Sequence, residues 1–140
     1  MLIIPVGSVV QFPNADPFFH NVFSLFDGKR FDLGLYEAGS TKSVTFSREG
    51  VSYIFCNIHP EMSGVILTLS TALYTKADAG GAFHLANVPA GDYEMHASTL
   101  SGQAMTSVRP QSGDCHLIVS LPEGLLRLIK MDWGIIFAPH

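Results

Sequence analysis

Charged side chains are scarce in this chain, and no basic cluster is present. Only 14% of its 140 residues are charged, the 8 Lys and Arg are scattered, and the formal net charge is −4. This composition argues against a nucleic-acid partner. Hydrophobic residues make up 47% of the chain, which supplies a core and argues against disorder. The uninterrupted apolar runs are short, so no segment is predicted to span a membrane.

The sequence patterns that mark common enzymes are also missing. There is no Gly-rich phosphate loop, no H-E-x-x-H motif and no sign of a nucleophile elbow. We therefore expect a protein that is not an enzyme. The start, residues 1–7 (MLIIPVG), is not a secretory signal, because it lacks a basic region and Pro5 stops its apolar run. Either the protein is cytoplasmic or the chain lacks its native leader.

Cysteine is rare, and one of the two cysteines lies in a revealing context. Cys56, His59 and Met62 follow one another at intervals of three, and His20 lies 36 residues earlier. One thiolate, two imidazoles and one thioether suit a copper ion that alternates between Cu(I) and Cu(II), because sulfur favours Cu(I) and imidazole serves both states. The alternatives are a disulfide between Cys56 and Cys115, or Cys56 as a small buried apolar residue.

Short β-rich runs separated by Gly, Pro, Asn and Asp predict an all-β sandwich or barrel. In the first half these runs are 8–12, 20–25, 43–46, 51–55 and 64–69. The segment 56–62 (CNIHPEM) then falls in a loop, where residues three apart can converge on one ion. His20 must come from a different strand. Asn21 beside it is expected to hydrogen-bond across to the Cys56 loop and tune the site.

Residues 1–69 resemble the cupredoxins, the small blue-copper proteins. The His20-Asn21-Val22 triplet is similar to the family's first ligand motif, and Cys56-x-x-His59-x-x-Met62 to its short ligand loop. The stretch 5–14 (PVGSVVQFPN) looks like the family's strand–turn–strand before the first ligand.

This resemblance implies a Greek-key β-sandwich with a type 1 copper that transfers single electrons. It implies that His20, Cys56 and His59 form the trigonal ligand set and that Met62 is the weak axial ligand. It also implies a redox partner protein and a periplasmic or other extracytoplasmic location. Cupredoxins usually carry one more strand before Leu2, so we expect one sheet edge to be uncovered.

The composition changes near Ser70, and the second half has its own pattern. The runs 83–85, 93–97 and 116–121 are predicted strands, with turns at 78–81 and 87–91. The stretch 81–93 (GAFHLANVPAGDY) resembles the carboxypeptidase regulatory-like modules, which are small transthyretin-like β-sandwiches. We expect such a module at 70–121. The tail, 122–140, matches no known family, although Pro122 is a suitable first residue for a helix.

Other uses of these residues remain open. Zinc accepts Cys and His, but it rarely takes a thioether and a structural zinc prefers a fourth strong ligand. A non-redox interaction module with a structural metal and a copper carrier are the competing functions. Solvent exposure is the default for the remaining histidines, and a second metal site from His96, Cys115 and His116 lacks any recognised spacing. The remaining histidines are His84, His96, His116 and His140.

Overall fold

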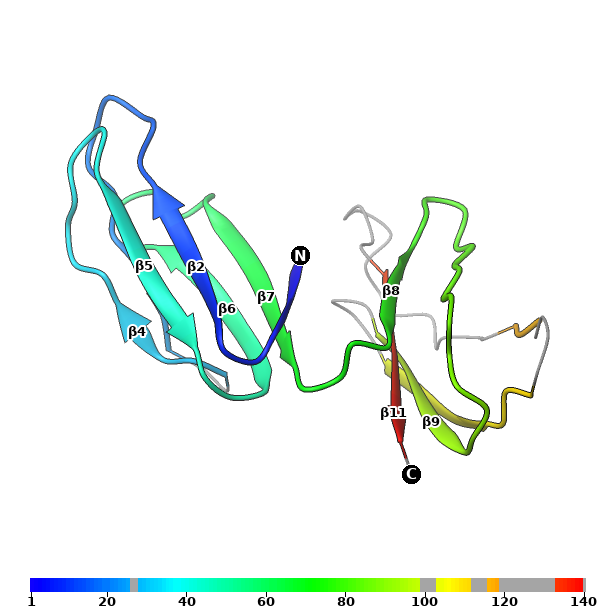
Figure 1. Cartoon of the computed structure of the whole chain (residues 1–140). Coiled ribbons are helices and arrows are strands. Elements are labelled where there is room, and N and C mark those ends of the chain that lie inside the picture. The colour runs from blue at the N-terminus through cyan, green and yellow to red at the C-terminus, as the bar shows by residue number, and fades with distance from the viewer. Residues whose placement is uncertain (26–27, 99–102, 112–115, 119–132, 140) are drawn as a thin grey trace. The chain divides into compact units, whose positions relative to one another are not determined.

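β-Strands account for all the regular structure in the described part of this computed structural model (Figure 1), and no helix is present there. The structure describes residues 1–140 except 26–27, 99–102, 112–115, 119–132 and 140. The contacts along the chain divide it into two compact units, Met1–Ser70 and Thr71–His140. We call these unit 1 and unit 2.

Unit 1 contains two β-sheets. The strands are β1 (Leu2–Pro5), β2 (Ser8–Pro13), β3 (Val22–Ser24), β4 (Phe31–Asp32), β5 (Thr41–Phe46), β6 (Gly50–Cys56) and β7 (Ser63–Leu69). One sheet has the order β1-β7-β6-β3-β4, with β1 parallel to β7 and the other pairs antiparallel. The other sheet is the antiparallel pair β2-β5.

The core of unit 1 lies between these two sheets. Val44 and Phe46 from β5 pack against Ile66 of β7 and Ile4 of β1, and Phe46 is fully buried. The alternation in β2 follows from this packing: Val10 faces the core, while the neighbouring Val9 is exposed. Unit 1 is therefore a β-sandwich.

The described residues of unit 2 form one antiparallel sheet of four strands with the order β10-β9-β11-β8. These strands are β8 (Tyr74–Ala77), β9 (Tyr93–Ser98), β10 (Gln103–Val108) and β11 (Trp133–Pro139). Tyr93, Met95 and Ala97 form its buried cluster, because alternate residues of β9 point to the same face. The tail thus contributes β11, which pairs with both β8 and β9.

Most of the predicted strands are present, with three differences. The runs 8–12, 43–46, 51–55, 64–69 and 93–97 are strands. The run 20–25 is shorter than predicted, because β3 covers only Val22–Ser24 and His20 makes an isolated bridge to Tyr36. The predicted strand 83–85 is wrong, and the described start of 116–121, residues 116–118, is not a strand either.

The error at 83–85 has a local cause. Asp78 folds the preceding turn, since its Oδ1 accepts hydrogen bonds from the N–H groups of Gly80 and Ala82. Asn87 has a φ of 59°, which turns the chain again. The segment therefore loops, although Phe83 and Leu85 still pack partly against the buried cluster of unit 2. The predicted helix start at Pro122 and the end of 116–121 lie outside the described residues.

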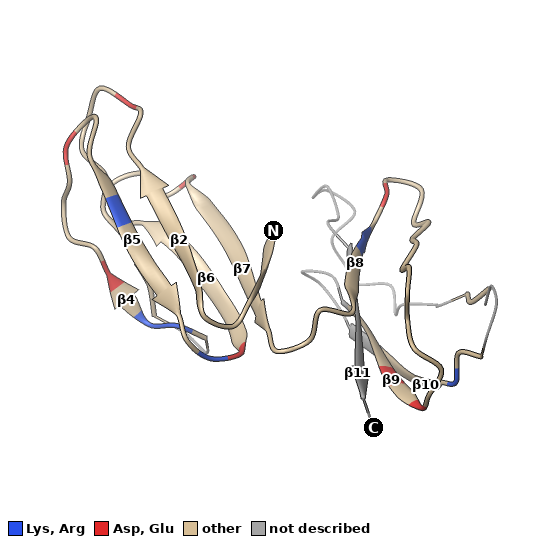
Figure 2. Cartoon of the chain, in the orientation of Figure 1, with Lys and Arg blue, Asp and Glu red and all other residues tan. Residues whose placement is uncertain are grey.

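Charged side chains are few in both units and lie mostly in loops and at strand ends (Figure 2). In the ranges that the structure describes, no helix has the length and apolar character needed to cross a membrane. The strand β2 has β5 as its one partner among the described strands, so the expected open edge is present in unit 1.

Candidate metal centre

His20 lies just before β3 and is held by its backbone. Its N–H donates to the carbonyl of Tyr36 at 3.1 Å, and the Tyr36 N–H donates back at 3.0 Å. The His20 side chain is buried, with 4% of the residue exposed. Its Nδ1 lies 3.7 Å from the sulfur of Cys56, across 36 residues of sequence.

Cys56 ends β6, and the loop after it returns to the same place. The Cys56 N–H donates to the Met62 carbonyl at 3.3 Å, and the Met62 N–H donates to the His59 carbonyl at 2.9 Å. These two bonds close the loop and place His59 Nδ1 3.6 Å from the Cys56 sulfur. The rings of His20 and His59 are 4.9 Å apart between centroids.

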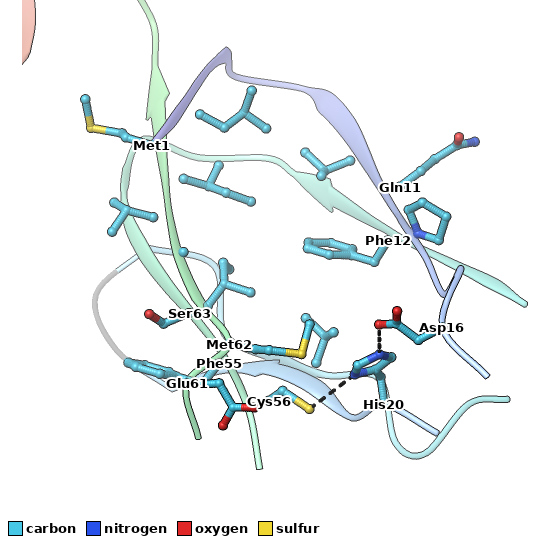
Figure 3. Close-up of a pocket in the computed structure, with 18 of the residues that line it drawn as sticks. Met1, Gln11, Phe12, Asp16, His20, Phe55, Cys56, Glu61, Met62 and Ser63 are labelled. Carbon is cyan, nitrogen blue, oxygen red and sulfur yellow. Dashed lines mark hydrogen bonds and ion pairs between the residues drawn. The ribbon is translucent and has the colours of Figure 1, made fainter. Parts of the chain in front are cut away.

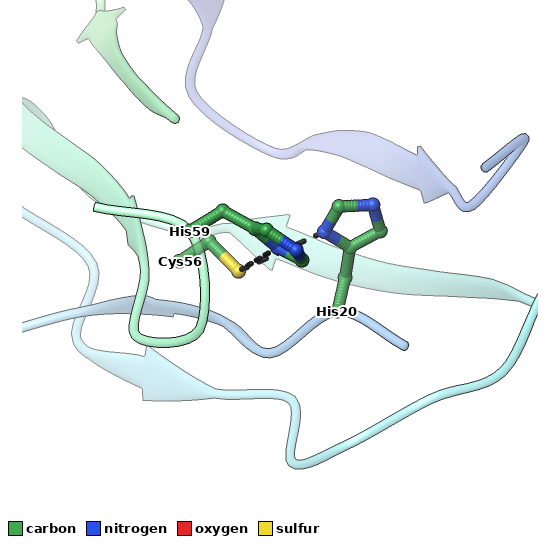
Figure 4. Close-up of side chains that lie close together, drawn as sticks. All are labelled: His20, Cys56 and His59. Carbon is green, nitrogen blue, oxygen red and sulfur yellow. Dashed lines mark hydrogen bonds between the residues drawn. The ribbon is translucent and has the colours of Figure 1, made fainter. Parts of the chain in front are cut away.

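The structure therefore brings together three of the four predicted ligands (Figure 4). One ligand atom each from His20, Cys56 and His59 lies within 4.8 Å of the other two, an arrangement that can hold a metal ion. Figure 4 shows the sulfur and the two imidazoles close together, with His20 on a different chain segment from Cys56 and His59. Two borderline nitrogen donors and one soft sulfur donor fit copper or zinc.

Met62 lies beside this cluster. It lines a cavity of about 660 Å³ together with His20 and Cys56 (Figure 3), and 42% of the residue is exposed. Its role as an axial ligand stays a prediction.

Hydrogen bonds set the charge of the sulfur. Burial raises the pKa of the Cys56 thiol, but hydrogen bonds outweigh burial and lower this pKa to about 6. In order of effect, these bonds are with the backbone N–H of Asn21, the side chains of His20 and His59, and the backbone N–H of Ile58. The thiolate is the form that binds metals, so the fold prepares the sulfur for one.

The same contacts act on the neighbouring groups. The hydrogen bond to Cys56 and then the one to Asp16 raise the pKa of His20, against the effect of burial. Burial and the nearby Cys56 charge raise the pKa of Tyr36. Phe18 covers the two imidazoles from outside, with its ring centroid 5.4 Å from that of His20 and 4.9 Å from that of His59.

Asn21 bonds across to the Cys56 loop as expected, and it does so through its backbone. The Asn21 N–H bonds the sulfur, while the side chain donates to Asp32 Oδ1 at 2.6 Å. The reason is the pairing of Val22 with Cys56, which brings the backbone of Asn21 to the sulfur.

Sequence reasoning missed Asp16, whose Oδ2 lies 2.8 Å from His20 Nε2. The only signal in the sequence was its position two residues after Asn14, the spacing of an Asx turn, in which an Asn side chain bonds the backbone two residues on.

The other candidate residues stay apart from this centre. Among the described residues, His20, Cys56 and His59 form the one group of metal-ligating type. His96 instead contacts Glu94, with 2.7 Å between Nε2 and Oε1. Cys56 is a free cysteine. Cys115 and His140 lie outside the described residues, and so does part of the conceivable second site of His96, Cys115 and His116.

Unit 1 is thus a β-sandwich in which two separate segments bring together a thiol and two imidazoles that could hold one metal ion. Several solved structures are similar to about half of the chain, among them the following three. A purple cupredoxin from Nitrosopumilus maritimus is 32% identical, over 49% of this chain and 76% of that one, with a TM-score of 0.44. A variant of amicyanin in its reduced form is 25% identical, over 49% and 68%, with a TM-score of 0.44.

The third structure is a copper-containing nitrite reductase from Thermus scotoductus SA-01. It is 29% identical over 49% of this chain and 19% of that one, with a TM-score of 0.46. No protein-family model matches the chain, and no curated protein matches it. Over about half of its length, the chain is similar to cupredoxins in its sequence and in its β-sandwich fold.

Proposed function

We propose that unit 1 is a type 1 copper module that transfers one electron at a time. In this proposal His20, Cys56 and His59 are the three strong ligands, and Met62 is the weak axial one. The observation that carries it is the convergence of the three donor atoms within 4.8 Å from two remote segments. Copper bound there would supply reversible one-electron chemistry between Cu(I) and Cu(II).

The donor set favours copper over zinc. A structural zinc site is closed by four strong ligands, whereas the fourth neighbour here is a thioether, which zinc rarely accepts. A thiolate suits either metal, but a thioether beside it favours Cu(I). The sulfur also has a pKa of about 6, so it is largely ionised at neutral pH and available as a ligand.

The protein residues hold the site in one arrangement. Two backbone bonds fix His20 to Tyr36, and two more close the loop that carries His59. Such a frame limits the movement of the ligands when the charge at the centre changes. It also argues against the carrier function, because a carrier exposes its sulfur ligands for exchange and Cys56 is only 5% exposed.

The surface near the site suits contact with a partner. Phe18, Ile58 and Met62 are each more than two-fifths exposed, and Phe18 stacks on both imidazoles. Exposed apolar side chains gathered at one place are typical of a protein contact. We therefore propose a redox partner protein that docks there, and an extracytoplasmic location for the exchange.

For unit 2 we propose a structural or interaction role, as a carboxypeptidase regulatory-like module. Its support is the 81–93 motif together with a small apolar cluster around Met95. This assignment is independent of the copper site.

Voltammetry of the metal-loaded protein tests the electron-transfer proposal. We expect copper to bind at one equivalent and to give a reversible one-electron wave. A preference for zinc, with no wave after copper loading, would instead establish the structural-metal alternative. Rapid loss of Cu(I) to a mild chelator would establish the carrier. Cys115→Ser should keep the wave and serves as the control for Cys56→Ser, which should lose it.

A further inference from the structure

His20 uses both of its ring nitrogens. Nδ1 faces the Cys56 sulfur at 3.7 Å, and Nε2 lies 2.8 Å from the Oδ2 of Asp16 (Figure 3). The two contacts are on opposite sides of the ring, and the dashed lines in Figure 3 show both. The predicted ligand is therefore held between its metal-facing side and a carboxylate.

The position of Asp16 is fixed by its neighbour Asn14 and does not depend on the bond to His20. Asn14 is 3% exposed, and its Oδ1 accepts a hydrogen bond from the Asp16 N–H at 3.0 Å. Its Nδ2 donates to the carbonyls of Phe18 at 2.7 Å and Tyr36 at 3.3 Å. These bonds involve only the backbone of Asp16, so the loop keeps its path when the Asp16 side chain is changed.

The chemistry of the contact determines the tautomer of the imidazole. An ionised carboxylate accepts hydrogen bonds and cannot donate them, so Asp16 draws a proton to Nε2 of His20. The Cys56 thiolate competes for a proton on Nδ1 only while the site holds no metal. A metal bound at Nδ1 would take the place of that proton, and the Nε2–H bond to Asp16 would remain. A carboxylate on the far nitrogen also makes the imidazole a more basic ligand, and such outer contacts tune a metal site.

We propose that Asp16 is a positioning residue that fixes the Nε2–H tautomer of His20 and favours Cu(II) over Cu(I) at this site. This proposal rests on the proposed copper function. A more basic imidazole stabilises the more highly charged ion more strongly, so Asp16 lowers the reduction potential. Asp16 itself does not touch the metal.

The first test compares Asp16→Asn with Glu37→Gln. Asp16→Asn keeps the size of the side chain and removes its charge. Glu37→Gln removes an equal charge from an exposed side chain of the same unit, for which the described structure shows no hydrogen bond to His20. Loss of an outer contact typically weakens metal binding about 10–100-fold, and we expect the lower end, because 49% of the Asp16 side chain is exposed.

In Asp16→Asn we expect about 10-fold weaker Cu(II) binding, with Cu(I) binding almost unchanged. A tenfold difference between the two states corresponds to a rise in reduction potential of about 59 mV. Glu37→Gln should shift the potential far less. If both variants shift it equally, the effect is one of net charge and the proposal is wrong; an unchanged potential in Asp16→Asn also overturns it.

The second test uses the metal-free protein. The spectra are taken in a Cys56→Ser background, in which no thiolate can accept a proton from Nδ1 of His20. In ¹⁵N-resolved NMR spectra, neutral His20 should there be the Nε2–H tautomer, with or without Glu37→Gln. Adding Asp16→Asn should weaken this preference. A neutral His20 with its proton on Nδ1 in the Cys56→Ser protein contradicts the proposal. Because no copper is needed, this measurement still decides the role of Asp16 if the copper function itself fails.

Discussion

The two units of this chain are built from the same kind of strand but bury different residues. Six described residues of unit 1 are polar and buried beside its apolar core: Asn14, His20, Asn21, Ser24, Ser52 and Thr68. The buried cluster described in unit 2 consists of Tyr93, Met95 and Ala97. Burying polar groups costs free energy unless they are hydrogen-bonded, so a sandwich that buries several of them is organised for something besides stability.

The hydrogen bonds of unit 1 show what that purpose is. Asn14, His20 and the backbone of Asn21 all act on the donor cluster or on the loop beside it. Ser24 and Thr68 have buried hydroxyls without a hydrogen-bond partner in the described structure, and neither belongs to the donor cluster. Having histidines is therefore not enough to form a metal site. Those of unit 1 converge on Cys56, whereas the histidines described in unit 2 belong to no such cluster.

The largest expected effect is on the stability of each unit, and it comes from truncating a core side chain in one unit at a time. Phe46→Ala should destabilise unit 1 by about 3–5 kcal/mol, because a fully buried aromatic ring leaves a cavity. Met95→Ala, also fully buried, should destabilise unit 2 by about 2–5 kcal/mol. Denaturant unfolding followed at the copper absorption band should then show an early loss only in Phe46→Ala. Loss of copper binding in Met95→Ala would break the comparison, because the site would depend on unit 2.

Copper loading should stabilise one unit and not the other. A ligand that binds only the folded state adds about 2.7 kcal/mol when its free concentration is 100 times its dissociation constant. Calorimetry should therefore show a chelator lowering the unfolding temperature of unit 1 and leaving that of unit 2 in place. Cys56→Ser is the control, and it should show no difference between the metal-loaded and metal-free samples.

The titration of Cys56 tests whether hydrogen bonds in unit 1 stabilise the thiolate. A free cysteine has a pKa of about 8.5, whereas hydrogen bonds lower that of Cys56 to about 6. The thiolate therefore stabilises the metal-free fold fully above about pH 8.5, and this contribution is lost as the pH falls through about 6. The difference in ultraviolet thiolate absorbance between the wild type and Cys56→Ser, which keeps Cys115, should titrate near pH 6. A midpoint near 8.5 would contradict the hydrogen-bonded thiolate.

The smallest expected effect is that of the axial position. Met62→Leu should keep the copper absorption band and raise the reduction potential, because a weak axial ligand tunes the potential without closing the site. The change in stability should stay within about 0.5 kcal/mol, since the residue is substantially exposed. Met105→Leu, an exposed methionine of unit 2, is the matched control and should leave the potential unchanged. An equal potential in wild type and Met62→Leu would remove Met62 from the ligand set.

The sequence predicted the parts of the fold that depend on local patterns. Strands β5, β6 and β7 alternate or run apolar between clear turn residues, so their positions follow from composition. The same reasoning failed at 83–85, where the apolar residues lie two apart but the turns around Asp78 and Asn87 prevent pairing. Nothing in the sequence of that segment shows which of the two tendencies prevails.

The residues of the site also fall into those that the sequence predicted and those that it did not. His20, Cys56 and His59 were predictable because residue type and spacing both point to a metal, and the structure brings them together. Asp16 was not, because its bond to His20 depends on the path of the loop that Asn14 fixes. The bond from Asn21 to the Cys56 loop was predictable, but not that the backbone N–H makes it, since the pairing of β3 with β6 decides which atoms of Asn21 face the sulfur.

The visible spectrum of the copper-loaded protein tests the central claim most directly. If the sulfur of residue 56 binds copper together with the two imidazoles, one equivalent of Cu(II) should give intense thiolate-to-copper absorption toward the red end of the spectrum, and Cys56→Ser should lose it. A folded wild-type protein without that absorption, or a Cys56→Ser variant that keeps it, would contradict the account.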